Sequence, residues 1–189
     1  KDYFNLLKVR SDVFREDTLY SPYRVKNGQR PDQISYEMYG DEQFYWVILQ
    51  INDITDYYNE WPLAEDELTA FVYKKYGGAA GAQQVHHYET VPVYNANDPP
   101  DLLLPGGLEV PENYVFTYPA VSGTTVYQTS TPVPVTNYQY ERRLNDRKSQ
   151  IFILDKKYIW DYERDVRTYA SNLDSPASFV DISNVSPSY

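Results

Sequence analysis

The segment from residue 23 to residue 52 constrains the fold more than any other part of this 189-residue chain. It opens with a short strand-like run and turns at Asn27-Gly28, a pair that is typical of tight turns. Pro31 then suits the first turn of a helix, where its missing N–H is no loss. Gly40 ends that helix in the manner of a C-terminal cap. The segment therefore begins with a strand followed by a helix.

The run 44–51 comes next and is apolar almost all round. Periodicity alone does not distinguish a buried strand from a buried helix in such a run. The acidic pair Asp41-Glu42 precedes it, and acidic side chains are favourable at a helix N-terminus because they meet the positive end of the helix dipole. We therefore expect a second helix here.

A further helix is predicted over about residues 65–76, and after it the sequence changes from a helix-forming to a strand-forming pattern. From residue 83 to 140, β-forming runs are broken repeatedly by proline and glycine, which predicts short hairpins and edge strands. The predicted class is α+β, with a small βαα module followed by a β-hairpin-rich region and a C-terminal helix with an extended tail. The expected divisions are an N-terminal arm (1–22), the module with an additional helix (23–76), a β-rich second region (77–140), a C-terminal helical segment (141–170) and the tail (171–189).

Charge and composition exclude several kinds of partner. The chain has 17 Lys and Arg against 27 Asp and Glu, a net charge of −10. Nucleic-acid binding depends on positive charge and counterion release, so we expect no nucleic-acid partner. No apolar run is long enough to span a bilayer, so we expect no membrane partner either. The chain also has no cysteine, which excludes disulfides and thiolate ligands.

The residues that could carry chemistry do not form a catalytic pattern. His86-His87 is the only histidine pair, and adjacent side chains on a regular strand point to opposite faces, so the two rings are not expected to share a metal ion. Carboxylates are plentiful, but none stands in a recognisable catalytic signature. The sequence predicts no enzyme, no catalytic residue, no metal site and no cofactor.

Aromatic and basic residues are better candidates for contacts with other proteins. The chain contains 21 tyrosines, whose large rings with polar tips suit protein interfaces. Trp61 has two interpretations that remain open: an exposed shelf shared with neighbouring tyrosines, or a cap on the small core. The candidate partner-binding residues are Tyr57, Tyr58, Trp61, Arg142, Arg143, Arg147, Tyr158 and Trp160.

The order of strand, turn, helix, glycine break and helix ending at Asn52 resembles a LysM module, which usually binds carbohydrate. The Tyr39-Gly40 pair and Asn52 match the LysM pattern, whereas Gln29 and Pro31 depart from it. The resemblance implies a sugar site, here expected to be vestigial, at Asn27, Gly28, Gln29, Asn52 and Asp53.

A second resemblance covers more of the chain. The motifs that carry it are Arg30-Pro31-Asp32, Tyr39-Gly40, Tyr45-Trp46-Val47-Ile48, Asn52-Asp53, Trp61-Pro62-Leu63, Glu141 to Lys148 and Ile151-Phe152-Ile153-Leu154. Together they are similar to the baseplate wedge protein 53 family of T-even-type contractile-tailed phages, in particular its cyanophage-like members.

That resemblance implies a structural subunit of the virion tail baseplate, made in the host cytoplasm. It would hold neighbouring wedge proteins together in the inner baseplate, with six copies per baseplate. Other wedge proteins and inner baseplate components would be its partners, and sugar binding is not expected. The alternative is a LysM-type module that binds peptidoglycan or chitin.

Overall fold

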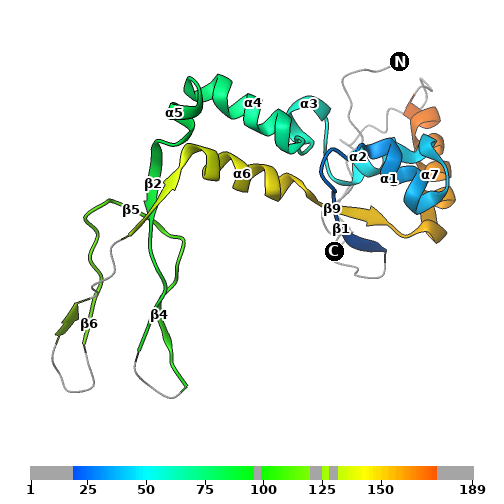
Figure 1. The fold of residues 1–189 in the computed structure, drawn as a ribbon. Coiled ribbons are helices and arrows are strands. Elements are labelled where there is room, and N and C mark those ends of the chain that lie inside the picture. Colours follow the sequence, from blue (N-terminus) through cyan, green and yellow to red (C-terminus); the bar gives the residue numbers. More distant parts are fainter. Residues whose placement is uncertain (1–18, 96–98, 120–124, 128–131, 174–189) are drawn as a thin grey trace, which may run out of the picture. The chain divides into compact units, whose positions relative to one another are not determined.

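The computed structural model describes residues 19–95, 99–119, 125–127 and 132–173 (Figure 1). Most of the predicted N-terminal arm and of the predicted tail therefore lies outside the described residues. Helices and strands are mixed, so the α+β prediction is confirmed.

The chain divides into two compact units. The split unit consists of Lys1–Trp61 together with Ser149–Tyr189, and the inserted unit is Pro62–Lys148. In the split unit the elements are β1 (Tyr20–Arg24), α1 (Pro31–Tyr39), the 3-10 helix η2 (Glu42–Phe44), α2 (Tyr45–Ile51), α3 (Tyr57–Glu60), β9 (Gln150–Leu154), the 3-10 helix η3 (Lys156–Tyr158) and α7 (Ile159–Leu173). In the inserted unit they are α4 (Glu65–Tyr76), α5 (Ala79–Ala82), β2 (Val85–Glu89), β3 (Val93–Tyr94), β4 (Leu102–Leu104), β5 (Glu109–Val110), β6 (Thr117–Pro119), β7 (Thr125–Tyr127), β8 (Val133–Thr136) and α6 (Asn137–Lys148).

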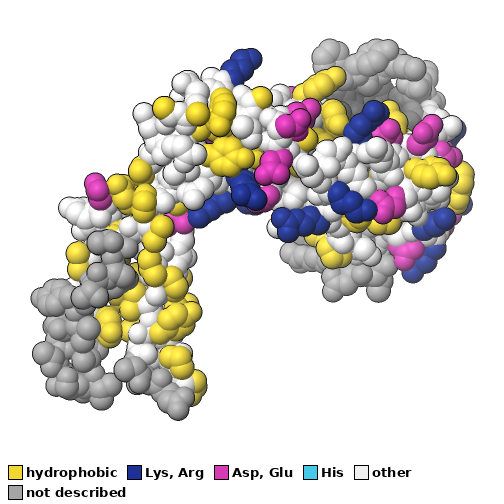
Figure 2. Space-filling view, in the orientation of Figure 1, with side chains coloured by type: hydrophobic (Ala, Val, Ile, Leu, Met, Phe, Trp, Pro, Cys, Tyr) yellow, Lys and Arg dark blue, Asp and Glu magenta, His cyan; other side chains and the backbone are white. Residues whose placement is uncertain are grey.

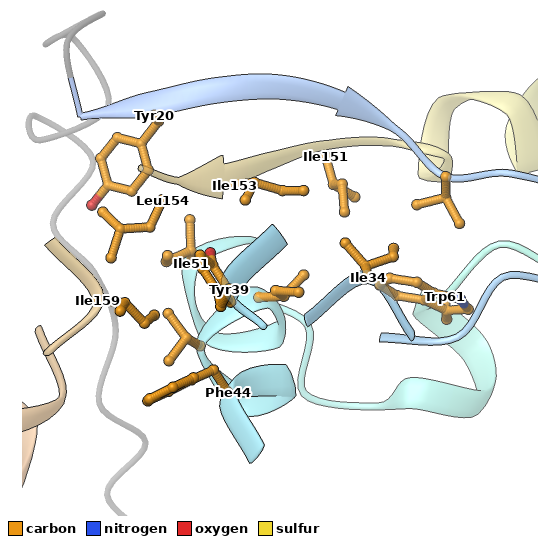
Figure 3. Packing of buried hydrophobic residues seen from close by; sticks show 13 residues of the cluster. Tyr20, Ile34, Tyr39, Phe44, Ile51, Trp61, Ile151, Ile153, Leu154 and Ile159 are labelled. Carbon is orange, nitrogen blue, oxygen red and sulfur yellow. The ribbon is translucent and has the colours of Figure 1, made fainter. Parts of the chain in front are cut away.

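The core of the split unit lies between a two-stranded sheet and its helices. β1 pairs with β9 in an antiparallel register that sets Tyr23 opposite Ile151. Ile151 and Ile153 of β9 point toward α1 and α2, where Ile34 is fully buried (Figure 3). The strand that completes this unit thus comes from beyond the inserted unit, whereas the sequence predicts a βαα module within one continuous segment.

Both predicted helices of the module are present, and each boundary has a local cause. Pro31 is the first residue of α1, and the backbone N–H of Arg30 donates to Gln33 Oε1 at 3.0 Å. Gly40 follows α1 with φ 83°, a left-handed conformation that glycine adopts without steric cost. The Asp41 carboxylate accepts a hydrogen bond from the Gln43 N–H at 2.9 Å and so begins η2, which leads into α2.

The two backbone groups of Phe152 bond to the side chain of Asn52. The Phe152 N–H donates to Asn52 Oδ1 at 2.8 Å, and its carbonyl accepts from Asn52 Nδ2 at 2.8 Å. Pro22, which has no N–H, stands opposite Phe152 in the register. Because successive residues of an antiparallel strand direct their backbone groups to alternate sides, this proline costs the β1–β9 ladder no hydrogen bond.

The inserted unit has a smaller core, formed by Leu68, Val72 and Ala82. Glu141 of α6 is buried beside it and accepts hydrogen bonds from Lys75 Nζ at 2.7 Å and from the Tyr76 hydroxyl at 2.8 Å. The Asn145 side chain binds both backbone groups of Leu63, at 2.8 and 3.0 Å. The sequence predicts that residues 62–76 belong with the first module, whereas in the structure they are part of the inserted unit and contact α6. The five-part division itself stays a prediction.

The β elements of the inserted unit are short, as the proline and glycine pattern predicts. β2 is the central strand of a three-stranded sheet in the order β5-β2-β8, while β3–β4 and β6–β7 are separate two-stranded pairs. Large apolar side chains stay exposed on the β3–β4 pair, among them Tyr94, Leu102 and Leu103 (Figure 2). Two-stranded pairs of this kind have little stability of their own in water.

Candidate partner-binding surface

An open groove of about 640 Å³ lies in the split unit between α7 and the segment that enters α2. Trp160 lines it from α7, and Phe44 and Trp46 line it from the other side. Trp160 is 65% exposed, and its ring meets the Phe44 ring edge to face, with 5.0 Å between centroids and 89° between planes. We call this feature the Trp160 groove.

The sequence of α7 explains why a tryptophan is left facing solvent. Asp155 accepts from the Lys157 N–H at 3.0 Å, which begins η3 and leads into α7. Ile159 is buried, and Tyr162 and Val166 are half-buried at the helical spacing of one face. Trp160 follows Ile159 directly and therefore lies off that face. A tryptophan exposed beside a groove is the residue type that most often carries the binding free energy of a protein interface.

Charged side chains surround the Trp160 groove. Arg167 donates to Glu163 at 2.6 Å, and Arg164 pairs with Asp161 at 2.9 Å along the exposed side of α7. Such exposed pairs contribute little to folding stability. An aromatic centre with a polar, charged rim is the usual composition of a protein–protein interface.

The predicted aromatic shelf separates into buried and exposed parts. Trp61 is only 5% exposed, and its Nε1–H donates to the Gln29 carbonyl at 3.0 Å. Tyr57 stacks on Trp61 with 6.0 Å between ring centroids, whereas Tyr58 is 85% exposed. Trp61 therefore belongs to the core, and of these three residues only Tyr58 offers most of its surface to a partner.

The three predicted arginines all lie on α6 in the inserted unit. Arg143 pairs with Glu89 of β2, while Arg142 and Arg147 are exposed. Burial by itself raises the pKa of Glu89, but the hydrogen bonds from His87 and Arg143 outweigh it and hold that pKa below its ordinary value. Arg143 is thus engaged inside its own unit.

Tyr158 and Trp160, the last two predicted partner residues, lie at the start of α7. Tyr158 is half-buried against the core of the split unit, and Lys157 Nζ lies 4.7 Å from the centre of its ring. Trp160 is the only one of the eight predicted residues that lines the Trp160 groove.

The residues of the predicted sugar site are engaged in contacts within the fold. Gln29 Oε1 accepts from the Tyr23 hydroxyl at 3.0 Å and from the Lys26 N–H at 3.1 Å, and Gln29 Nε2 donates to Glu37. The Asn52 amide is bound to Phe152, as described above. Gly28 and Asp53 stand in left-handed turns, with φ values of 68° and 55°. Asn27 and Asp53 also make interactions within the protein.

Sequence reasoning missed Phe44, Trp46 and the charged side of α7 as parts of one surface. A signal was present, because residues 159, 162 and 166 define the buried face of α7 and leave Trp160 outside it. The pairing of α7 with the segment before α2 had no such signal, since it depends on contacts between distant parts of the chain.

Within the described ranges, no group of three or more His, Cys, Asp or Glu side chains is placed to hold a metal ion. The same ranges contain no helix with the length and apolar character needed to cross a membrane.

The split unit of this α+β protein thus exposes an aromatic groove with a charged rim, a composition typical of surfaces that bind other proteins. A family model described as Base plate wedge protein 53 matches residues 4–97. Baseplate wedge protein gp53 of Enterobacteria phage T4 is 34% identical over 65 residues, which cover 34% of this chain and 33% of that protein. The chain thus aligns with about a third of the length of that relative. The chain belongs to the base plate wedge protein 53 family.

This result confirms the resemblance to the baseplate wedge protein 53 family, whereas the likeness to its cyanophage-like members stays a prediction. Neither match names a LysM module, so the LysM-like interpretation stays a prediction.

Proposed function

We propose that the chain is a structural subunit of a phage tail baseplate wedge, located in the virion, and that it holds neighbouring wedge proteins together in the inner baseplate. The observation that carries this proposal is the family match over residues 4–97, together with a relative that is itself a baseplate wedge protein. The role is one of assembly and needs no catalytic group.

The Trp160 groove is the proposed docking site for a neighbouring wedge protein. Trp160 supplies a large apolar surface, and Phe44 behind it supports the ring from one side. Arg164 and Arg167 also line it, and each is paired with a carboxylate of α7, so the rim carries charges of both signs. A partner that inserts an apolar side chain and surrounds it with polar groups would match this groove. Tyr58 and the exposed arginines Arg142 and Arg147 are proposed as secondary contacts.

The number of copies is part of the proposal. Six copies per baseplate would follow if each of six wedges carried one chain. Counting the subunit in reconstituted baseplates, by mass measurement of the assembled particle, tests this number separately from the docking site.

The alternative of a peptidoglycan- or chitin-binding module is less well supported. A sugar site at the predicted residues would need the side chains of Gln29 and Asn52, and both are already bound within the fold. Pelleting with insoluble peptidoglycan would revive this alternative if binding were strong and saturable.

The direct test is co-assembly of the full chain with the wedge proteins of the same phage. Trp160→Ala should weaken binding by about 30-fold or more, the equivalent of about 2 kcal/mol at an interface hot spot. The matched control is Tyr36→Ala, which removes an aromatic ring from a residue that is 67% exposed and does not line the groove. Equal binding by both variants would contradict the docking site. Failure of the unmodified chain to bind any wedge protein, across a range of salt concentrations, would contradict the function itself.

A further inference from the structure

We infer that His86 and His87 form a two-imidazole chelating site for a divalent transition-metal ion in the inserted unit. Cu²⁺ and Ni²⁺ are the ions that the geometry favours. This inference is independent of the assembly function, because it rests on the local structure of β2 and α6.

The site depends on a β-bulge. In a regular strand the two rings would point to opposite faces, which is why the sequence predicts that they do not share an ion. In the structure the register between β2 and β8 shifts between Val85 and His87, so that an extra residue is accommodated. A bulge redirects side chains, and here His86 Nδ1 lies 2.9 Å from His87 Nδ1. The prediction of opposite faces is therefore wrong at this pair.

A carboxylate fixes the orientation and the tautomer of His87. His87 Nε2 lies 3.0 Å from Glu89 Oε1, and the same carboxylate oxygen is held by Arg143 of α6. A carboxylate accepts a hydrogen bond, so Nε2 carries the proton and Nδ1 presents a lone pair. Metal-binding histidines in proteins are commonly held in this way, with the second ring nitrogen donating to a carboxylate.

The His86 ring is also held in place. It stacks on Tyr140 of α6 with 3.9 Å between ring centroids and 11° between the planes. His87 is mostly buried, with 11% of its side chain exposed, whereas His86 is exposed. Both ligands are therefore preorganised by contacts to α6, and an ion has access from the side of His86.

The separation of the two nitrogens indicates which ions fit. Metal–nitrogen distances for imidazole are about 2.0–2.1 Å, so two nitrogens 2.9 Å apart subtend an angle of about 90° at a shared ion. A tetrahedral zinc site would need the two nitrogens roughly 3.3 Å apart. An angle of about 90° suits neighbouring positions in square-planar or octahedral coordination, as in Cu²⁺ and Ni²⁺ sites.

No third protein ligand of the His, Cys, Asp or Glu type completes the site in the described part of the chain. Water would fill the remaining positions, so the expected affinity is that of a two-histidine chelate and not that of a closed structural site. Without an ion, His86 Nδ1–H donates to His87 Nδ1. When an ion binds, this proton moves to His86 Nε2, so that both Nδ1 atoms present a lone pair.

The chain contains only two histidines, so any imidazole coordination must come from this pair. The test is titration of the full-length chain, free of any affinity tag, with Cu²⁺ alone. We expect one ion per chain and an electron paramagnetic resonance spectrum with coupling to two imidazole nitrogens. His86→Ala and His87→Ala should each lower the affinity at least 10-fold.

A positioning role for Glu89 gives a further readout. Glu89→Gln should lower the affinity by about 10- to 100-fold while both nitrogen couplings remain. Glu109→Gln is the matched control, because Glu109 lies opposite Glu89 in the neighbouring strand and the change removes the same charge. Circular dichroism shows whether each histidine variant folds. If one does not, the electron paramagnetic resonance spectrum of the unmodified chain with Cu²⁺ tests whether two imidazole nitrogens bind the ion. A spectrum without two nitrogen couplings, or equal affinity in His86→Ala, would overturn the inference.

Discussion

The side-chain amide of Asn52 binds both backbone groups of Phe152, a residue 100 positions further along the chain. The same amide also donates to the Ile48 carbonyl at 2.8 Å, near the end of α2. One side chain thus joins the second helix of the split unit to the outer edge of β9. It thereby pairs with an N–H and a C=O of β9.

Replacing Asn52 by alanine tests this junction. Asn52→Ala removes three hydrogen bonds, two of them to the backbone of Phe152. We expect a loss of about 2–4 kcal/mol in the free energy of unfolding, measured by urea denaturation. Asn59→Ala is the control, since Asn59 is exposed and its side-chain amide donates to the nearby Asp56 carboxylate. Equal losses in the two variants would contradict the role of Asn52.

Replacing Trp61 by alanine tests whether this residue belongs to the core or binds a partner. Trp61→Ala should lower the free energy of unfolding by about 3–5 kcal/mol, because it empties a core position and leaves the Gln29 carbonyl without its donor. The exposed neighbour Tyr58 should tolerate the same change within about 0.5 kcal/mol. A fully stable Trp61→Ala protein that no longer binds its partners would show instead that Trp61 acts at a surface.

The buried carboxylate of Glu141 makes Lys75 important to the inserted unit. The hydrogen bond to Glu141 raises the pKa of Lys75, so the lysine stays charged in the fold. Lys75→Met leaves Glu141 buried without a cation, and we expect a loss of about 1–2 kcal/mol, since the lysine itself is half exposed. Lys74→Met, on the same helix, is the control and should change stability by less than about 0.5 kcal/mol. Urea denaturation followed by circular dichroism measures both, and equal effects would contradict the pairing.

The buried Tyr39 and the half-buried Tyr162 lead us to expect a loss of stability at alkaline pH. Burial raises the pKa of Tyr162 from 10.0 to about 12 and raises that of Tyr39 as well. The Tyr39 hydroxyl is also fully buried. A raised pKa means that the folded state holds the proton more tightly. The stabilisation is therefore complete below pH 10 and is lost as the pH rises from 10 to about 12.

Urea denaturation at a series of pH values between 9 and 12 measures this loss. Tyr162→Phe removes one of the two contributions and should flatten the decline, whereas Tyr58→Phe, at an exposed site, should leave it unchanged. The same decline in all three proteins would show that these buried hydroxyls are not its cause.

Local signals in the sequence predict the helices of the split unit well. Pro31, Gly40 and Asp41 each act through their own backbone geometry or a hydrogen bond two residues away, so their effects are visible in a short window. The same holds for the amphipathic part of α7. Short β elements between residues 83 and 140 also follow from proline and glycine, whose effects on a strand are local.

Contacts between distant residues could not be predicted in this way. Nothing near Ile151 indicates that β9 pairs with β1 on the far side of an inserted unit. The bulge before His87 likewise depends on how β2 pairs with β8, and without it the two rings would lie on opposite faces. The Trp160 groove needs α7 beside Phe44, which is a tertiary contact.

The interrupted sequence of the split unit has a consequence for the order of synthesis. A ribosome makes β1, α1 and α2 first, but it must complete the whole of Pro62–Lys148 before it makes β9. Until then the hydrophobic faces of α1 and α2 lack the strand that covers them, and a nascent chain in this state exposes apolar surface. The inserted unit has all of its own elements earlier, so we expect it to fold first. Its folding would then shorten the flexible loop that must close when β9 meets β1.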